Sequence, residues 1–279
     1  MFGLLTHLFA GKNLDKRFPV AHHWFLKLNR FFAKNADQTI SLPLNTVLSY
    51  NPKQAGISYY LYNFGEYEPY TTSVLLNLVK PGDTVIDIGA NIGYYTVLGA
   101  TKVGKKGKVL AIEPEPTNLS YLKRNLVQNN IQNTQVFAGA VSHQEGELPL
   151  YISPTSAGEH SLVVKTNRTI SVPVETLDHL VNIYKLEPTL IKIDVEGAEM
   201  DVLAGASQTL SGLRPTIIFE YSLRPPSSTY NLQNLIKHRY QLFFLDEKSK
   251  MTTTINVEEI NKLLTKQTYI NLLAVPVPK

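Results

Sequence analysis

The chain has 279 residues, of which 43% are hydrophobic and 18% are charged, and it contains no cysteine. This composition is typical of an ordinary globular protein, and the lack of cysteine excludes disulfides, thiolate metal sites and cysteine nucleophiles. The net charge of +4 arises within residues 1–40, which hold six Lys or Arg and two Asp, so the remainder is formally neutral and a nucleic-acid-binding surface is not expected.

The segment HHWFLKLNRFFAK, residues 22–34, has the pattern of a basic amphipathic helix, with aromatic and leucine side chains on one face. Ordinary amphipathicity favours a helix that packs on the domain or on a partner. The alternative is that residues 20–35 bind an anionic membrane surface. No apolar run approaches the roughly 20 residues that a bilayer-spanning helix needs. Because a chain without cysteine fits a reducing compartment, we expect a cytoplasmic protein, either free or bound peripherally to a membrane.

Residues 38–62 predict a short hairpin or lead-in strands, with a turn at Asn51-Pro52. The segment EPYTTSVLLNLVKPGD that follows predicts a helix that stops at Pro81-Gly82. We assign residues 1–64 to an N-terminal extension made of a helix and a hairpin.

From residue 84 onward, apolar segments typical of strands alternate with segments at helical spacing. This alternation predicts βαβ units, and the continuous apolar runs VID, VLAI, LIKI and TIIF indicate strands buried on both faces of a parallel sheet. We therefore expect an α/β domain over residues 65–279. Its expected strands lie at 84–89, 107–114, 134–142, 147–153, 161–175, 189–197 and 214–222, its expected helices at 93–103, 116–130, 176–186 and 198–210, and two further segments at 231–246 and 268–277.

The stretch TVIDIGANIGYYTVLGA places a glycine-bearing turn after the first of these strands. A dinucleotide fingerprint needs G-x-G-x-x-G, but Asn91 and Tyr94 occupy its second and third glycine positions, and no Gly-Lys-Ser/Thr of a Walker A loop follows. Glu113 ends the next strand, 20 residues after Gly93, where an acid can accept hydrogen bonds from both hydroxyls of a ribose. The pattern favours a nucleoside cofactor without a diphosphate, such as S-adenosylmethionine. A strand-to-helix turn without a ligand is the alternative.

Several segments between about residue 65 and residue 221 carry a family resemblance. They are GEYEPYTTSVLLNLVKPGDTVIDIGANIGYYT, LAIEPEPTNLSYLKRNL, GAVS, VETLDHL, LIKIDVEGAEMDVLAGA and IIFEYS. Together they resemble the FkbM-type family of S-adenosylmethionine-dependent methyltransferases, and the pair DIGANIG and IKIDVEGAE is the most specific part. The resemblance implies a Rossmann-like methyltransferase fold, in which a seven-strand, mostly parallel sheet has its last strand antiparallel and helices on both faces. It also implies a methyl transfer, usually to oxygen.

The resemblance further implies where the cofactor binds. The turn after the first strand would line the methionine and ribose, Glu113 would accept the ribose hydroxyls, and Asp194 would border the reacting methyl group. Glu68 would reach the cofactor's amino group from the preceding segment. The expected cofactor-binding residues are Glu68, Asp87, Gly89, Ala90, Asn91, Gly93, Glu113, Pro114, Ala140, Val141 and Asp194.

Methyl transfer to a hydroxyl needs a group that removes the hydroxyl proton. The candidates near the strand ends are Asp194, Glu196 and Glu220, and the more distant ones are His143, His160 and His179. Glu196 also has the alternative role of capping the helix that follows it. His160 lies in the polar loop SPTSAGEH, either in a lid over the pocket or simply solvated. A divalent cation on the three acids is the less favoured alternative, because no compact ligand motif supports it, and we predict no metal.

These patterns predict an S-adenosylmethionine-dependent methyltransferase that acts on a hydroxyl of a sugar, glycan or polyketide-like molecule. The rival hypothesis is a degenerate methyltransferase fold that serves as a binding or scaffold module. An oxidoreductase is disfavoured because the glycines of the nicotinamide fingerprint are missing. The acceptor pocket is expected to involve residues 38–70 and 150–170, which carry no diagnostic pattern.

Overall fold

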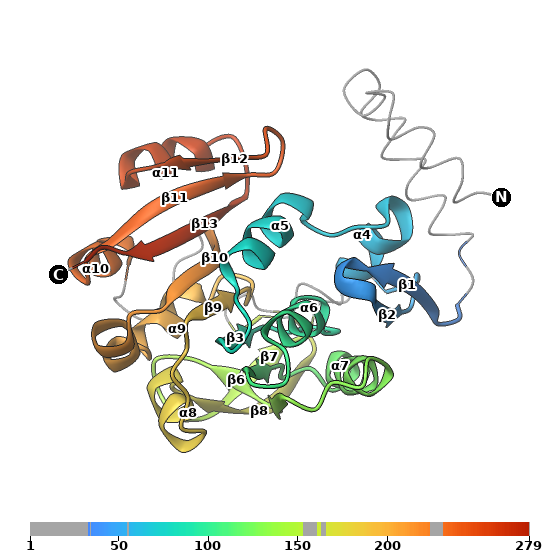
Figure 1. The fold of residues 1–279 in the computed structure, drawn as a ribbon. Helices are drawn as coiled ribbons and strands as arrows, with labels where there is room; N and C mark the ends of the chain where they lie inside the picture. Colours follow the sequence, from blue (N-terminus) through green and yellow to red (C-terminus); the bar gives the residue numbers. More distant parts are fainter. Residues whose placement is uncertain are drawn as a thin grey trace.

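The structure is a computed structural model that describes residues 33, 35–54, 56–152, 161–162, 166–223 and 231–278. Its centre is an eight-stranded sheet with the strand order β12-β11-β13-β10-β9-β3-β4-β5 (Figure 1). These strands are β3 (Thr84–Ile88), β4 (Lys108–Ile112), β5 (Thr134–Phe137), β9 (Leu190–Ile193), β10 (Thr216–Ser222), β11 (Tyr240–Asp246), β12 (Met251–Thr254) and β13 (Tyr269–Pro276). Apart from residues 33 and 35, the amphipathic helix expected in residues 20–35 lies outside the described residues.

The direction of the strands confirms the expected α/β sheet. Neighbours from β5 through β10 run parallel, and β13 runs antiparallel between β10 and β11. The eighth strand, β12, was not predicted; it pairs antiparallel with β11 at the edge, and all its residues are exposed. Because the sequence MTTT has no apolar alternation, it carries no periodic signal for a strand.

Successive residues of a strand point to opposite faces of the sheet. Because the central strands carry apolar side chains on both faces, helices cover both faces. In β9, Ile191 and Ile193 belong to one core cluster and Leu190 to the other. The cluster that contains Ile191 packs under α8 (Leu177–Ile183), α9 (Glu199–Ala204), α10 (Leu232–Lys237) and α11 (Val257–Leu264). The other packs under α4 (Ile57–Phe64), α5 (Pro69–Leu78), α6 (Tyr94–Val103) and α7 (Pro116–Gln128). Figure 1 shows α6 and α9 on opposite sides of β3 and β9.

The region before the sheet differs in part from the prediction. A hairpin is present, formed by β1 (Gln38–Leu42) and β2 (Thr46–Tyr50), but its turn is the 3-10 segment η1 (Pro43–Asn45) rather than Asn51-Pro52. The segment expected to continue as strand forms the helix α4 instead. Its tyrosines favour strands locally, yet they pack edge-to-face against one another and against Tyr67, so tertiary contacts override the local preference.

The single strand expected at residues 134–142 is broken in two. β5 ends at Phe137, and β6 (Ala140–Val141) belongs to a separate three-stranded sheet with β8 (Thr169–Glu175) and β7 (Gly146–Tyr151). Gly139 lies at the break, where a Cβ atom would come within 2.6 Å of both the Phe137 ring and the Pro173 carbonyl oxygen. The chain therefore leaves the central sheet beside the end of β4 and places β6 across that end.

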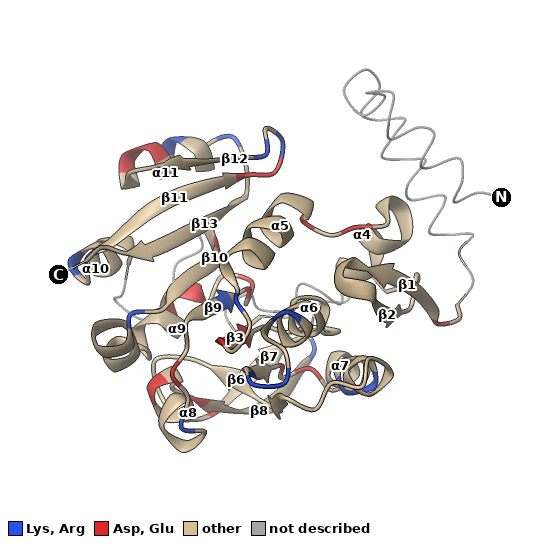
Figure 2. Ribbon diagram, viewed as in Figure 1, with Lys and Arg blue, Asp and Glu red and all other residues tan. Residues whose placement is uncertain are grey.

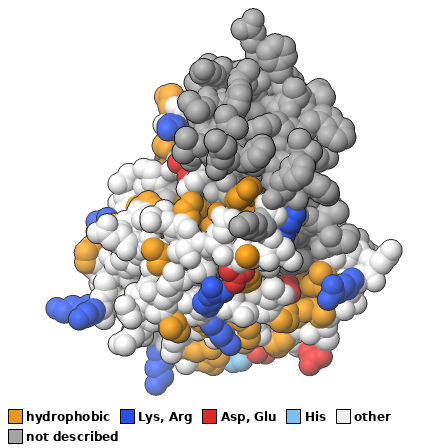
Figure 3. Space-filling view, turned by 90° about the vertical axis from the view of Figure 1, so that its right-hand side faces the viewer, with side chains coloured by type: hydrophobic (Ala, Val, Ile, Leu, Met, Phe, Trp, Pro, Cys, Tyr) orange, Lys and Arg blue, Asp and Glu red, His pale blue; other side chains and the backbone are white. Residues whose placement is uncertain are grey.

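Within the described residues, no helix combines the length and the hydropathy that crossing a membrane requires. On the face shown in Figure 3, the described Lys and Arg side chains are scattered rather than gathered into one patch.

Candidate functional site

A hollow of about 520 Å³, open to solvent, lies at the carboxyl ends of the central strands. Eight of the predicted site residues line this hollow: Gly89, Asn91, Glu113, Pro114, Ala140, Val141, Asp194 and Glu196. The remaining lining residues, which the sequence did not single out, are Ile88, Ile112, Asn118, Leu150, Leu162 and Val195. The hollow therefore has an apolar side from the small sheet and an acidic side from β3, β4 and β9.

The two glycines of the turn after β3 are required by the protein's own packing. Gly89 has φ +82°, and a Cβ atom there would lie 1.8 Å from the Asp194 carbonyl oxygen. Gly93 has φ +94°, and its Cβ atom would lie 2.8 Å from Leu122 in α7. Both positive φ values favour glycine, so the turn closes against β9 and α7 whether or not a ligand is bound. Gly93 and Ala90, two residues of the same turn, do not line the hollow.

Glu113 is held in a defined orientation at the hollow. Its Oε2 accepts a hydrogen bond from the Asn91 backbone N–H at 2.8 Å, and its Oε1 accepts one from the Glu115 N–H at 2.8 Å. Burial raises the pKa of Glu113 to about 7, against the effect of these two hydrogen bonds. Each carboxylate oxygen can accept a further hydrogen bond, so Glu113 can bind two hydroxyl groups of a ligand.

A second group of acids surrounds Lys192, a fully buried lysine of β9 that the sequence analysis missed. Acidic residues gather at the ends of β3 and β9 in Figure 2. The Lys192 Nζ atom lies 3.4 Å from Asp194 Oδ2 and 5.2 Å from the centre of the Tyr95 ring. Burial lowers the pKa of Lys192, but the nearby carboxylates of Asp194, Glu68, Asp87 and Glu220 outweigh it and raise that pKa. The sequence signal that could have identified Lys192 is its position as a single charged residue in the apolar run LIKI.

Glu68 and Asp87 belong to this second group and do not line the hollow. Glu68 accepts hydrogen bonds from the Tyr95 hydroxyl at 2.7 Å and from Asn271 Nδ2 at 2.8 Å. Asp87 is buried, it is the register partner of Lys192, and it accepts a hydrogen bond from Thr96 Oγ1. Burial raises the pKa of Asp87 to about 6. The Asp87 side chain therefore lies in the buried group around Lys192 and is not among the residues that line the hollow.

The chain after β9 brings both of its acids to the hollow. Asp194 and Glu196 both line it, because Glu196 (φ +53°) and Gly197 (φ +99°) bend the chain back. Ala198 occupies the N-cap position of α9 and provides no side-chain cap hydrogen bond. The loop N–H groups of Val195 and Gly197 donate instead to Glu199 Oε1.

Glu220 in β10 lies near the same group of acids. Burial, and then the charges of Asp194, Glu196 and Glu199, raise the pKa of Glu220 to about 10. At neutral pH this carboxyl group is protonated and can donate a hydrogen bond. Within the described residues, the oxygens of Asp194, Glu196 and Glu220 do not form a set within 4.8 Å of one another, as a shared cation would require.

None of the three histidine candidates is among the described residues that line the hollow. His160 lies outside the described residues. The His143 Nδ1 atom lies 3.5 Å from Asp201 Oδ1. His179 belongs to α8 and contacts two other glutamates.

Comparison with known proteins adds to this geometry. The family model described as the methyltransferase FkbM domain matches residues 87–269, which include both DIGANIG (residues 87–93) and IKIDVEGAE (residues 191–199). Methyltransferase 1 of Beauveria bassiana is 30% identical over 163 residues, which cover 50% of this chain and 65% of that protein. Hexuronic acid methyltransferase AglP of Haloferax volcanii is 28% identical over 148 residues, covering 52% and 59%. 2-O-methyltransferase NoeI of Sinorhizobium fredii is 28% identical over 163 residues, covering 52% and 65%.

The chain thus spans about three fifths of the length of these curated relatives. Among solved structures, the methyltransferase FkbM of Methylobacillus flagellatus matches with 17% identity and a TM-score of 0.44, covering 77% of this chain and 52% of that one.

Proposed function

The chain belongs to the FkbM methyltransferase-domain family, and from this premise we propose that it transfers a methyl group from S-adenosylmethionine to a hydroxyl group of a sugar or glycan. The observation that carries the proposal is the position of Glu113. Its carboxylate is oriented by two backbone N–H groups and lines a hollow of about 520 Å³ at the carboxyl ends of the strands. Ligands of open α/β sheets bind at this edge.

In the proposed complex, Glu113 accepts hydrogen bonds from the two ribose hydroxyls. The adenine lies against the apolar side of the hollow, which is made by Ala140, Val141, Leu150 and Leu162. The methionine part extends toward Asp194, whose negative charge suits its positively charged groups. S-adenosylmethionine supplies the activated methyl group when bound; the chain supplies alignment, exclusion of water and removal of a proton.

We assign removal of the acceptor proton to Asp194. Asp194 Oδ2 lies 3.4 Å from the buried Lys192 ammonium group, which attracts the ionised form of this carboxylate and holds it in place. Glu220 lies near Asp194 but does not line the hollow, so it is assigned no contact with the acceptor. Glu196 and His160 remain alternative bases, and variants of each belong in the same assay.

The acceptor class rests on two relatives. One is named a hexuronic acid methyltransferase and the other a 2-O-methyltransferase. Since both align with about half of this chain, a sugar hydroxyl is the acceptor to test first, and a polyketide-like hydroxyl is the second.

The first experiment is calorimetric titration of the full chain with S-adenosylmethionine. We expect Glu113→Ala to weaken binding about tenfold or more, because a hydrogen bond to a charged group contributes about 1.5–3 kcal/mol. The matched control is Glu147→Ala, an exposed glutamate of β7 whose carboxylate accepts a hydrogen bond from Ser171.

If wild-type protein does not bind at saturating cofactor, the proposal is wrong. If the cofactor binds, its labelled methyl group is followed into uronic acid glycosides and neutral glycosides. Binding without transfer to any hydroxyl acceptor would favour the rival hypothesis of a binding or scaffold module.

A further inference from the structure

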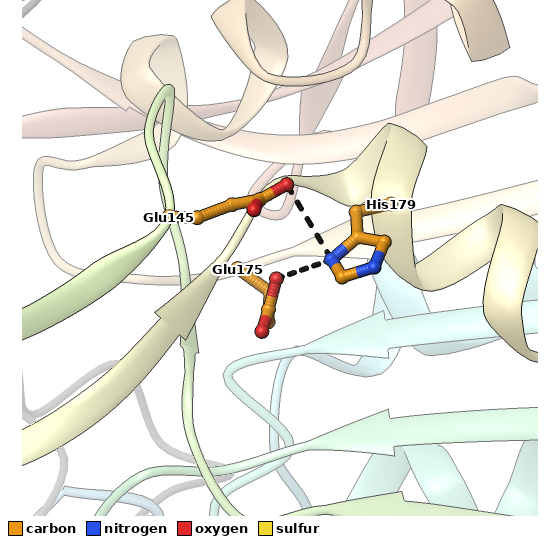
Figure 4. Close-up of side chains that lie close together, drawn as sticks. All are labelled: Glu145, Glu175 and His179. Carbon is orange, nitrogen blue, oxygen red and sulfur yellow. Dashed lines mark hydrogen bonds and ion pairs between the residues drawn. The ribbon is translucent and has the colours of Figure 1, made fainter.

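Three side chains outside the hollow converge on one point. Glu145 lies in the loop between β6 and β7, Glu175 is the last residue of β8, and His179 lies in the first turn of α8 (Figure 4). Both carboxylates face the same ring nitrogen: His179 Nδ1 lies 2.5 Å from Glu175 Oε2 and 3.4 Å from Glu145 Oε1. In the described part of the chain, no other three His, Asp or Glu residues bring their donor atoms within 4.8 Å of one another.

Within the cluster, the charge of the two carboxylates exceeds that of the imidazole. Two carboxylates face one imidazole, which contributes at most one positive charge. No Lys or Arg among the described residues forms an ion pair with Glu145 or Glu175. A divalent cation with two carboxylates and a neutral imidazole would be neutral overall.

The spacing of the donor atoms fits one metal ion. Ligand atoms bound to a tetrahedral Zn²⁺ at about 2.0–2.2 Å lie about 3.3–3.6 Å apart. The distance from Glu145 to His179 has this value already, and Glu175 would move away from the ring by about 1 Å, which a glutamate rotamer allows. We propose that Glu145, Glu175 and His179 form a binding site for a divalent transition-metal cation such as Zn²⁺.

The backbone holds the donors in place before a metal arrives. Thr176 Oγ1 accepts a hydrogen bond from the His179 N–H at 3.2 Å and fixes the start of α8. The Glu175 carbonyl accepts one from the Ser142 N–H at 3.0 Å, which joins β8 to the chain leading to Glu145.

The site also has room for water ligands. Glu145 and His179 line an open depression beside the cluster. Asp178 and Glu187 also line this depression. The Asp178 carboxylate already accepts hydrogen bonds from the backbone N–H groups of Gln208 and Thr209. Two oxygens and one imidazole nitrogen suit Zn²⁺, Co²⁺ or Mn²⁺, with water at the remaining positions. Such an ion would tie three elements together away from the hollow, so its role would be structural.

The test is calorimetric titration of the untagged, chelator-treated full chain with ZnCl₂, repeated with CoCl₂ so that the absorption spectrum of bound Co²⁺ reports its ligands. We expect binding of one Zn²⁺ per chain that raises the melting temperature. Glu145→Gln, Glu175→Gln and His179→Ala should each weaken it about tenfold or more. His238→Ala and Glu147→Gln, which change the same residue types elsewhere, should leave it unchanged.

Cofactor binding and circular dichroism serve to show that each variant is folded. The proposal is overturned if the wild-type chain binds neither metal, or if His179→Ala binds Zn²⁺ as tightly as the wild type. In the second case the metal is held by other histidines of the chain, and the three side chains form only an ion-pair cluster.

Discussion

Replacing Lys192 by methionine tests whether the buried lysine holds the acids of the site in place. Methionine fills a similar volume but removes the ammonium group that lies 3.4 Å from Asp194. Asp194, Asp87 and Glu68 are then left around an apolar side chain without a compensating charge. Removing one partner of a buried ion pair destabilises a protein by about 3–5 kcal/mol, and Lys192 is completely buried. We expect the free energy of unfolding to fall by about this amount at pH 8.

The loss should be smaller in acid. Burial raises the pKa values of Glu68, Asp87 and Glu220, and Lys192 lowers them. Without Lys192 these carboxyls bind protons more tightly in the folded protein than in the unfolded chain. A folded state that binds more protons loses stability as the pH rises. Because the pKa of Asp87 is already about 6, the variant should recover part of its stability between pH 8 and pH 5 relative to wild type.

The assay is denaturant unfolding of both proteins at pH 5 and pH 8. Lys108→Met, which changes an exposed lysine of β4, is the matched control and should change stability by less than about 0.5 kcal/mol. The reasoning is refuted if Lys192→Met destabilises the protein by less than about 1 kcal/mol, or by the same amount at both pH values.

Three further predictions address the turn and the hollow. Gly89→Ala should lower the free energy of unfolding by about 2 kcal/mol or more, because the new Cβ atom would overlap the Asp194 carbonyl and the residue has φ +82°. Gly212→Ala, which has open space around it, should be neutral or slightly stabilising. Equal effects of the two substitutions in unfolding curves would contradict the packing argument. Asp194→Asn should reduce kcat/KM about 100-fold or more if Asp194 is the base. Glu220→Gln should leave kcat/KM near wild type at pH 7, since Glu220 is already neutral there. Similar losses of kcat/KM in both variants would contradict the assignment of Asp194 as the base. S-adenosylmethionine affinity should rise by up to about tenfold from pH 6 to pH 8, because the ribose hydroxyls donate to the ionised form of Glu113, whose pKa is about 7. Titrations of Glu113→Gln at the two pH values should show no such rise. A rise of affinity in that variant would assign the pH effect to another group.

Local sequence patterns were enough for the elements that are strongly periodic or buried on both faces. The apolar runs predicted β3, β4, β9 and β10, and the rule that ligands bind at the carboxyl ends of parallel strands located the hollow. The spacing between Gly93 and Glu113 placed the acid correctly at its edge. The helix α4 and the break between β5 and β6 were not predictable in this way. Both features involve contacts with other elements: Tyr60 of α4 packs against Tyr67, and Gly139 lies close to the Pro173 carbonyl.

The sequence by itself determined the class of the sheet, the position of Glu113 and the family of the chain, because each depends on a short motif or a regular alternation. Only the tertiary structure decided which acids share a space. It separated Asp87 and Glu68 from the hollow and gathered them around Lys192, and it brought Glu145 to His179 from another part of the chain. The physical reason is that charge, burial and metal-ligand spacing are properties of side chains that meet in space. Register and strand order, which set those meetings, leave no local trace in the sequence.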